Sequence, residues 1–480
     1  MPPKQVLKKK PAAKAPAAKK VVVKKPLPKP VAKKASESPA PKQAPAASAN
    51  AQKAKKVPEL VRGMKDITPR EGAYWLQMNH AAEKIAEAYN FQFIETPIVE
   101  EAALFVRTIG RGTDVVDKEM YIFDDRDGTK LALRPEATAS VARSYIAHGM
   151  HTLPQPVKMW YNGPMFRHDR PQAGRYRQFH QFACETIGEH DPAIDAELIV
   201  TAYNFLRDLG VETQVHINSI GTPEDRERYL VELLGYLRSK RTYLSEESKK
   251  RMAKNPLRIL DSKEEEDQLV IEEAPQILDW LSEQSKQYFM KVLEYLDDME
   301  VPYVLTPRLV RGLDYYTDTV FEFYQIDEDM KSQSALGGGG RYNLLIQELG
   351  GHPTPAAGFA LGLERVLHAM KKGEQGDNAI EKKSPIFFAH LGEPARRRTL
   401  YLIEQLRREG IVLYHNISKP SLKSQLELAN KHGASHALIL GQKELQDGTI
   451  IIRDMASGIQ EIVDQKKIGR EVRKIMGLPV

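Results

Sequence analysis

Residues 159–185 read MWYNGPMFRHDRPQAGRYRQFHQFACE, the densest polar cluster of the chain. An apolar, strand-like run leads to Arg167, a polar loop containing a glycine follows, and apolar and polar residues then alternate. This pattern predicts an antiparallel hairpin of two strands. Because side chains alternate between the two faces of a strand, four residues of the returning strand are expected on one face. They are Arg177, Phe179, Gln181 and Glu185.

Four arginines lie around this hairpin, at positions 167, 170, 175 and 177. A guanidinium group binds phosphate through two hydrogen bonds, so the cluster suits a polyanion such as ATP or the end of an RNA. Taken alone, the same residues could also form an ordinary charged hairpin at the surface. The sequence here has no glycine loop of the kind that cradles phosphates in nucleotide hydrolases.

Two further clusters could carry chemistry. Residues 308–317 read RLVRGLDYYT, in which an arginine and two tyrosines beside a glycine either line a pocket or pack as a structural turn. Residues 358–367 read GFALGLERVL, where small residues allow close approach of the backbone. Arg365 ends this strand-to-helix segment, and it could bind a ligand or pair with a nearby acid.

The segments around the hairpin have recognisable periodicity. Apolar residues at helical spacing over 73–89 predict an amphipathic helix, and a strand-like run interrupted by Pro97 follows over 91–99. Short apolar runs at 121–123 and 130–133 flank a turn-rich stretch and predict an antiparallel hairpin.

The second half of the chain changes character twice. Residues 221–300 are rich in Glu, Lys and Leu with helical periodicity, including 277–281 and 288–296, and predict a helical insertion. Strand-like sequence at 320–324 leads into glycines 337–340. After a charged stretch over 371–383, buried-strand runs at 385–389, 411–414 and 437–440 alternate with helix-like segments. They predict a separate small α/β domain.

Length and composition fit a soluble protein of two to four domains. We find no apolar run long enough to cross a bilayer and no apolar core of a secretion signal, so a reduced cytoplasmic setting is expected. The single cysteine, Cys184, excludes an internal disulfide and is expected to be a buried structural thiol. The thirteen histidines show no metal-ligand spacing, and no protein-bound metal is expected.

The net charge of +6 is unevenly distributed. Residues 1–56 hold 16 Lys, one acid and no aromatic residue, a charge of +15, whereas the rest of the chain carries −9. Such a Lys/Pro/Ala-rich arm buries too little apolar surface to fold and is expected to be disordered. It could aid solubility or hold RNA phosphates electrostatically. A mitochondrial presequence is disfavoured because the arm has no Arg and many prolines.

Together the three polar clusters resemble the signature regions of class II aminoacyl-tRNA synthetases. Residues 95–100 (ETPIVE) resemble motif 1, 166–169 (FRHD) motif 2 and 362–365 (GLER) motif 3. Residues 311–316 (RGLDYY) resemble the signature of the histidyl-tRNA synthetases, with bacterial-type wording. The resemblance spans about residues 60–480 and includes 62–66 (RGMKD) and 255–263 (NPLRILDSK).

The resemblance implies an α+β fold: an antiparallel sheet flanked by helices, a helical insertion domain and a C-terminal α/β anticodon-binding domain. The implied boundaries are a basic arm over 1–56, a catalytic domain over 57–220 and 301–372 split by the insertion over 221–300, a linker over 373–383 and the C-terminal domain over 384–480. Pro97 matches a position at the dimer interface of the family, which implies a homodimer.

The implied activity is that of a histidine–tRNA ligase. Histidine attacks Mg-ATP to give histidyl-adenylate and pyrophosphate, and the histidyl group then passes to the 3′ end of tRNA(His). The alternative is a catalytically silent relative, such as the regulatory subunit of ATP phosphoribosyltransferase. Two features argue against that alternative: the signature arginines are present, and the C-terminal domain is retained.

The resemblance also implies roles for individual residues. Arg167 and Arg311 are the implied catalytic residues. Histidine would be held by Glu136, Ala137, Thr138, Arg167, Gln181, Glu185, Arg311, Tyr315 and Tyr316. ATP would be held by Arg167, Asp169, Arg175, Phe179 and Arg365. Two positions depart from the usual pattern. Ala137 replaces a common Gly, which should be tolerated if its φ is negative, and Asp169 replaces a common Glu.

Overall fold

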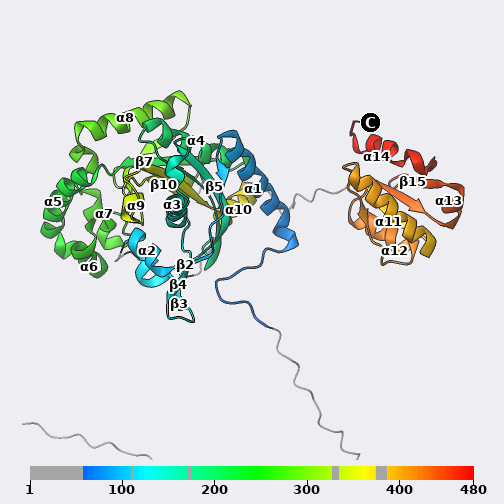
Figure 1. Cartoon of the computed structure of the whole chain (residues 1–480), viewed down its shortest axis with the longest axis horizontal. Helices are drawn as coiled ribbons and strands as arrows, with labels where there is room; N and C mark the ends of the chain where they lie inside the picture. The colour runs from blue at the N-terminus through cyan, green and yellow to red at the C-terminus, as the bar shows by residue number, and fades with distance from the viewer. Residues whose placement is uncertain are drawn as a thin grey trace, which may run out of the picture. The chain divides into compact units, whose positions relative to one another are not determined.

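The computed structural model describes residues 58–110, 113, 115–170, 174–326, 335–373 and 386–479. The predicted basic arm over 1–56 and nearly all of the predicted linker over 373–383 lie outside these residues. Residues 58–373 and 386–479 are described separately below (Figure 1).

An eight-stranded sheet forms the centre of the larger part (Figure 1). Its strand order is β1 (Gln92–Phe93), β5 (Val157–Phe166), β6 (Gln178–Ile187), β11 (Ala356–Gly362), β10 (Ala335–Arg341), β9 (Thr317–Gln325), β7 (Thr213–Ser219) and β8 (Tyr303–Leu305). The six inner strands are antiparallel to one another, and only the short edge strands β1 and β8 run parallel to their neighbours. The predicted antiparallel sheet and its β5–β6 hairpin are confirmed.

One face of this sheet packs against four helices in a single apolar core. They are α1 (Pro69–Ala88), α4 (Pro192–Asp208), α8 (Glu283–Asp298) and α10 (Leu363–Gly373). The predicted amphipathic helix is α1, which buries Met78, Ala82 and Ala86 at helical spacing. Cys184 is a free thiol buried in this core, on the face of β6 opposite its neighbour Glu185, as expected.

The other face carries a second core, which includes α3 (Thr138–Ala147), α5 (Pro223–Ser239) and α9 (Leu345–Glu348). Beside it lies a three-stranded antiparallel sheet in the order β2 (Val99–Glu101), β4 (Lys130–Leu133) and β3 (Tyr121–Asp124). This sheet contains the predicted hairpin over 121–133. The helix α2 (Ala102–Ile109) and the π-helical turn η1 (Val115–Glu119) follow β2.

Residues 221–300, the helical segment, are helical as predicted. They form α5, η3 (Arg241–Tyr243), α6 (Glu246–Lys254), η4 (Pro256–Ile259), α7 (Glu265–Glu272), η5 (Ile277–Trp280) and α8. The helical periodicity at 277–281 does not correspond to an α-helix, because only the 3₁₀ turn η5 forms there. The last helix, α8, packs against α4 and shares the core of the central sheet.

Residues 386–479 form a five-stranded sheet. Its order is β13 (Tyr414–His415), β12 (Ile386–His390), β14 (His436–Leu440), β15 (Thr449–Asp454) and β16 (Gln460–Asp464). Helices α11 (Glu393–Arg408), α12 (Leu422–Lys431), α13 (Gln442–Asp447) and α14 (Ile468–Met476) accompany it, giving the predicted α/β domain. The predicted strand over 411–414 is wrong except at its end. Ile411 is buried in the core, but pairing begins only at Tyr414.

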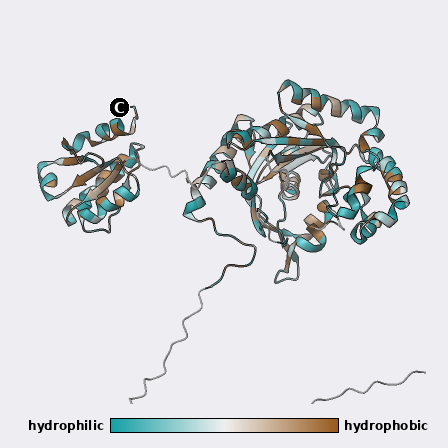
Figure 2. Ribbon diagram, turned by 180° about the vertical axis from the view of Figure 1, so that it is seen from behind, coloured by the Kyte–Doolittle hydropathy of each residue, from teal (hydrophilic) through white to brown (hydrophobic). Residues whose placement is uncertain are grey.

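Hydropathy follows this architecture. In Figure 2 the outward faces of the helices are largely teal, and brown residues gather on strands and inward faces. In the part of the chain that the structure describes, no helix is long and apolar enough to cross a membrane.

Candidate active site

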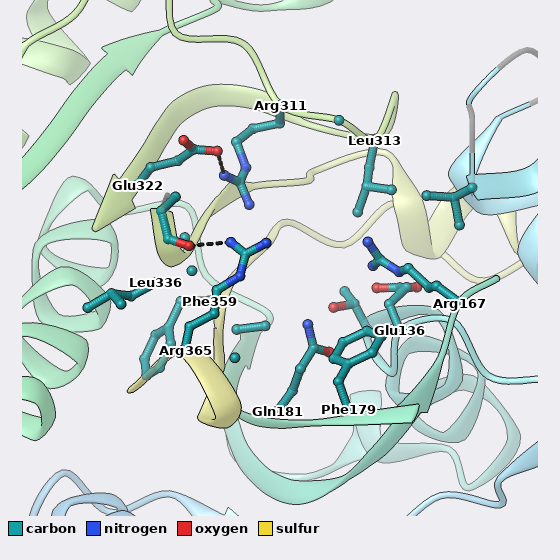
Figure 3. Close-up of a pocket in the computed structure, with 18 of the residues that line it drawn as sticks. Glu136, Arg167, Phe179, Gln181, Arg311, Leu313, Glu322, Leu336, Phe359 and Arg365 are labelled. Carbon is teal, nitrogen blue, oxygen red and sulfur yellow. Dashed lines mark hydrogen bonds and ion pairs between the residues drawn. The ribbon is translucent and has the colours of Figure 1, made fainter. Parts of the chain in front are cut away.

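The three polar clusters of the sequence meet in one cavity of about 390 Å³. Twelve of the residues predicted to act at the site line it, namely Glu136, Thr138, Arg167, Asp169, Arg175, Phe179, Gln181, Glu185, Arg311, Tyr315, Tyr316 and Arg365. In Figure 3, Arg311 and Arg365 approach from one side, Arg167 and Glu136 from the other, and Phe179 and Gln181 rise from β6. The structure therefore brings together residues that are far apart in the sequence.

Glycines allow the backbone of β10 and β11 to approach this cavity closely. A Cβ atom on Gly338 would lie 2.8 Å from Nη1 of Arg311, and one on Gly358 would lie 1.7 Å from Oε2 of Glu185. At Gly337 and Gly339 the Cβ would meet carbonyl oxygens of β11 at 2.2 and 2.0 Å. The glycine run thus belongs to a central strand, and no larger side chain fits its positions without displacing neighbours.

Glu185 lies at the closed end of the cavity and is 1% exposed. Its Oε1 accepts a hydrogen bond from the Thr138 hydroxyl at 2.7 Å and a longer one from Tyr161 at 3.4 Å, while its Oε2 accepts from the Tyr342 hydroxyl. Burial raises the pKa of Glu185 to about 8, although the hydroxyl bonds favour the ionised form. The protonated form of Glu185 is therefore favoured at neutral pH, and a hydrogen-bond donor placed against the carboxyl group would favour the ionised form.

Glu136 is the second buried carboxylate. It accepts from the backbone N–H of Ala139, at the start of α3, at 3.0 Å and from the Tyr315 hydroxyl at 3.3 Å. Burial raises the pKa of Glu136, while its hydrogen bonds and Arg167 act in the opposite direction. Two acids, Glu136 and Glu185, therefore share one enclosed end of the cavity with tyrosine and threonine hydroxyls.

Ala137, predicted at the histidine site, has its side chain in the core rather than on the cavity surface. It is 1% exposed and precedes α3 directly. Its φ is −110°, so a residue with a Cβ is accommodated without strain, as the sequence argument required. A contact of Ala137 with histidine stays a prediction. Because the side chain lies in the core, this contact would involve only the backbone of Ala137.

The rest of the cavity wall, called here the arginine end, is rich in arginine, and Arg167 lies at its border with Glu136 (Figure 3). Arg167 donates from Nε to the Pro135 carbonyl at 2.8 Å, and its guanidinium lies 5.6 Å from the Phe179 ring centre. Arg175 pairs with Asp169 at 3.3 Å. Arg365 donates to the carbonyl of Ala335, at the start of β10. These bonds fix the guanidinium groups while leaving them on the cavity surface (Figure 3).

Arg311 is held from β9. It forms an ion pair with Glu322, whose other oxygen accepts from the Tyr324 hydroxyl at 2.6 Å. Burial alone would lower the pKa of Arg311, but the Glu322 carboxylate raises it, so the arginine stays charged. The pKa of Arg365 is lowered by burial and by the charges of Arg175 and Arg167. This excess of positive charge makes the arginine end suited to a polyphosphate.

Sequence reasoning missed several lining or supporting residues, among them Tyr161, Tyr342, Glu322 and Arg258. Tyr161 and Tyr342 reach Glu185 from β5 and from the end of β10, and only the sheet register brings them together. For Glu322 a local signal existed, because it is an acid inside the apolar strand run over 320–324. An acid in a central strand calls for a buried partner.

Arg177 was expected on the same face as Phe179, and this is wrong. It precedes the first residue of β6, its N–H bonds the Gly63 carbonyl, and its guanidinium bonds the Arg62 carbonyl at 3.3 Å. The ring of His180 bonds Glu364 at 2.9 Å and meets the edge of Trp75, and that of His168 packs on Tyr121. Both rings therefore make packing contacts.

Metal ligands do not converge in the described ranges. No group of three or more His, Cys, Asp or Glu side chains there could hold an ion. Glu322, the acid next to Arg311, has both oxygens engaged by Arg311 and Tyr324.

Comparisons with known proteins agree with this geometry. A family model described as histidyl-tRNA synthetase matches residues 63–366, and one described as an anticodon binding domain matches 388–475. A histidine–tRNA ligase of Dehalococcoides mccartyi is 44% identical over 415 residues, covering 86% of this chain and 98% of the relative. One of Desulforamulus reducens is 43% identical over 409 residues, covering 85% and 97%.

A solved structure is also similar over most of the chain. The apo histidyl-tRNA synthetase of S. aureus matches with a TM-score of 0.72 and 33% identity, covering 87% of this chain and 100% of that one. The match therefore includes both parts described above.

Proposed function

The chain belongs to the histidyl-tRNA synthetase family, and from this premise we propose how its cavity joins histidine to tRNA. Its activity is that of a histidine–tRNA ligase, an aminoacyl-tRNA synthetase that uses ATP. Nothing in the comparisons favours a silent regulatory relative. One observation carries the mechanism: a single cavity joins two buried, hydroxyl-bonded carboxylates to the four predicted arginines, with Arg258 as a fifth.

Histidine occupies the carboxylate end of the cavity, the enclosed end that contains Glu136 and Glu185. Glu185 and Tyr316 bond the two ring nitrogens, because a carboxylate accepts from one N–H while a tyrosyl hydroxyl serves the other nitrogen. Tyr315 shapes the wall. An apolar amino acid of similar shape would leave these buried groups unpaired, and that cost is the basis of discrimination.

The α-amino group of histidine faces Glu136, Thr138 and Gln181. The Oε1 atom of Gln181 supports this placement, since it is buried and has no hydrogen-bond partner among the described residues. An ammonium group would supply the missing donor. The histidine carboxylate then lies beside Arg167, at the border between the two ends.

ATP occupies the arginine end. Phe179 stacks on the adenine, Asp169 lies on the adenine side, and Arg175 and Arg365 hold the γ-phosphate or the adenine. Arg167 and Arg311 flank the α-phosphate from opposite sides, as their approach in Figure 3 allows. Fixed cations aimed at phosphate oxygens stabilise charge that develops in the transition state without reorganising.

The reaction has two steps. An oxygen of the histidine carboxylate forms a bond to the α-phosphorus while the bond to the β-phosphate bridging oxygen breaks, giving histidyl-adenylate and pyrophosphate. A hydroxyl of the terminal adenosine of tRNA then attacks the activated carbonyl, and AMP leaves. Arg167 and Arg311 act by positioning and by neutralising phosphate charge. We assign no side chain as general base.

Mg²⁺ enters as part of the ATP substrate. Both oxygens of Glu322 are engaged, which fits an ion held mainly by phosphate oxygens. The ion would neutralise phosphate charge and favour departure of pyrophosphate.

The assembly is a homodimer. Apolar side chains are exposed on and beside the edge strands β1 and β2, including Phe93 (58% exposed) and Ile98 (40%). Exposed apolar groups at unpaired strand edges favour burial against a second copy. Sedimentation should give twice the mass of one chain, and a concentration-independent monomer would refute this assignment.

The remaining assignments follow the family. Residues 384–480 bind the anticodon region of tRNA(His), the helical insertion spans 221–300 between catalytic parts over 57–220 and 301–372, and the protein works in the cytoplasm. The match of residues 388–475 to the anticodon-binding model supports the first of these assignments.

Histidine-dependent exchange of pyrophosphate into ATP tests the proposal. Purified chain with Mg²⁺ should exchange with histidine and not with the other amino acids tested singly, and should then charge tRNA(His). Folded protein that gives no exchange with histidine would overturn the activity. Exchange with several amino acids would overturn the assignment of the carboxylate end.

A further inference from the structure

Residues 309–316 form the arginine loop, which carries Arg311, Tyr315 and Tyr316 into the cavity. It lies between β8 and β9 and has no helical or strand structure. A loop without its own hydrogen-bond ladder keeps one shape only if its surroundings impose it. What surrounds this loop therefore decides where Arg311 points.

Side chains of the helical segment form hydrogen bonds with the loop at three alternate residues, Gly312, Asp314 and Tyr316. Asn255 donates from Nδ2 to Oδ1 of Asp314 at 2.8 Å. Arg258 donates to the Gly312 carbonyl, and Arg226 donates to the Tyr316 carbonyl at 3.2 Å. Two of these bonds end on backbone carbonyls, so they fix the course of the main chain itself.

The stretch that carries Asn255 and Arg258 is itself held by hydrogen bonds and by packing in the core. Ser262, near the end of the same stretch, donates to Oδ2 of Asp267 at 2.5 Å, and the Ser248 hydroxyl donates to the same oxygen at 2.6 Å. Asp267 is completely buried. Ile259 packs in the apolar core that also contains Tyr315. The stretch 255–262 is thus anchored on both sides.

Asp314 is held from the opposite side as well. Its backbone N–H bonds the Ile109 carbonyl at 3.3 Å, and its Oδ2 lies against Gly110, where a Cβ would be only 2.7 Å away. The Asp314 side chain thus lies between Gly110 and Asn255, at a position that is still exposed to solvent. Loss of the Asn255 bond removes one of the two restraints on it.

We propose that Asn255 and Arg258 are positioning residues, which act through Asp314 and Gly312 to hold Arg311, Tyr315 and Tyr316 in their working geometry. This inference rests on the proposed function and extends it to the stretch 255–263, to which no role was given. The ATP contacts of Phe179 and Arg365 should be spared, because Phe179 lies on β6 and Arg365 on α10, outside the loop. Arg258 itself lines the cavity whereas Asn255 does not, so Asn255 gives the cleaner test of positioning.

Kinetics of pyrophosphate exchange separate this role from a general loss of structure. In Asn255→Ala we expect kcat to fall about 10–100-fold, since a displacement of about 1 Å at a reacting group has effects of this size. The KM for histidine should rise, because Tyr316 moves with the loop, whereas the KM for ATP should change much less, because Phe179 and Arg365 stay in place. A smaller folded fraction would lower kcat and leave both KM values unchanged, and that result would overturn the proposal.

A double-mutant cycle tests the route. Asp314→Ala combined with Asn255→Ala should be no worse than either alone, because both remove the same bond. Fully additive losses would contradict action through Asp314. Arg258→Lys should retain more activity than Arg258→Ala, since a lysine can still donate to a carbonyl. Lys250→Ala, at an exposed position on α6, is the matched control and should behave as wild type.

Hydrogen exchange tests whether Asn255 and Arg258 restrain the arginine loop, and it does not depend on enzyme activity. Amides of residues 309–316 should exchange faster in Asn255→Ala than in wild type, while those of β6 should not change. Unchanged amide exchange in the loop would show that Asn255 does not restrain it and would overturn the proposal. If wild type shows no histidine-dependent exchange of pyrophosphate, the proposed function fails, but amide exchange still decides whether Asn255 restrains the loop.

Discussion

The two ends of the cavity are built on different physical principles. At the carboxylate end, Glu185 and Glu136 are buried and their oxygens already accept bonds from hydroxyl and amide donors. At the arginine end, Arg167, Arg175 and Arg365 remain on the cavity surface, anchored by one or two bonds each. The carboxylate end can therefore distinguish ligands by shape and hydrogen bonding, and the arginine end can distinguish them by charge.

This difference separates selectivity from rate. An amino acid gains affinity from this buried network only if its side chain makes matching hydrogen bonds, so the network discriminates strongly against an apolar side chain of similar shape. Preformed cations stabilise any triphosphate, so they accelerate the reaction with little regard to the amino acid. Mutations at the two ends should therefore change different kinetic parameters, and the following predictions run from the largest effect to the smallest.

Replacing Arg311 tests the arginine end most severely. In Arg311→Ala we expect kcat of pyrophosphate exchange to fall about 10²–10³-fold, the size seen when one preformed transition-state donor is removed. The KM for ATP should change much less. Exchange kinetics measure both, with Arg407→Ala, an exposed arginine of α11 paired with Glu404, as the control. A loss that appears in KM alone would contradict a role in the transition state.

Replacing Glu185 tests the carboxylate end. Glu185→Ala leaves the hydroxyls of Thr138, Tyr161 and Tyr342 without their acceptor, so kcat/KM for histidine should fall about 100-fold. The KM for ATP should stay close to that of wild type. Varying each substrate in turn measures the two parameters. Equal losses for histidine and ATP would mean that the two ends are not separate.

A change at Arg365 should have a more moderate effect. Arg365→Ala removes one of several cations, and we expect the KM for ATP to rise about tenfold, as befits one charge-assisted hydrogen bond. The KM for histidine should be unchanged. If titration with ATP gave a wild-type KM, Arg365 would be a structural residue that only supports Ala335.

The smallest effect concerns stability and pH. The pKa of Glu185 is raised to about 8, so the folded state holds a proton that the unfolded chain releases above its ordinary pKa. The resulting stability is full at low pH and is lost as pH rises towards the folded pKa, by up to roughly 1.4 kcal/mol per pH unit. Between about pH 4.5 and 8, the melting temperature of wild type should therefore fall more steeply with pH than that of Glu185→Gln. Parallel curves would refute a raised pKa.

Local patterns were enough to predict most of the fold. Helical spacing identified α1, and alternation identified β5 and β6, because each buries one face against a core. The pattern failed at Ile411, which is apolar because it is buried, not because it pairs in a strand. It was also silent on β10, since four glycines oppose strand propensity and only the neighbouring backbone explains them.

The site was predictable only as far as its motifs reach. The arginine clusters and Glu185 could be placed at a common site through their resemblance to a family. Tyr342 could not, because it meets Glu185 through the register of β10, β11 and β6, which pairs Gly358 with Glu185. The role of Asn255 depends likewise on a contact with Asp314, 59 residues away.

The glycine strand also has a genetic consequence. Any missense change at Gly337, Gly338 or Gly339 adds at least a Cβ, and each would meet backbone within 2.3 Å. No conservative replacement exists at these codons, because alanine is already too large. In a saturation screen for growth, this strip should therefore tolerate only synonymous changes, whereas exposed positions away from the cavity, such as Lys250 on α6, should accept several residues.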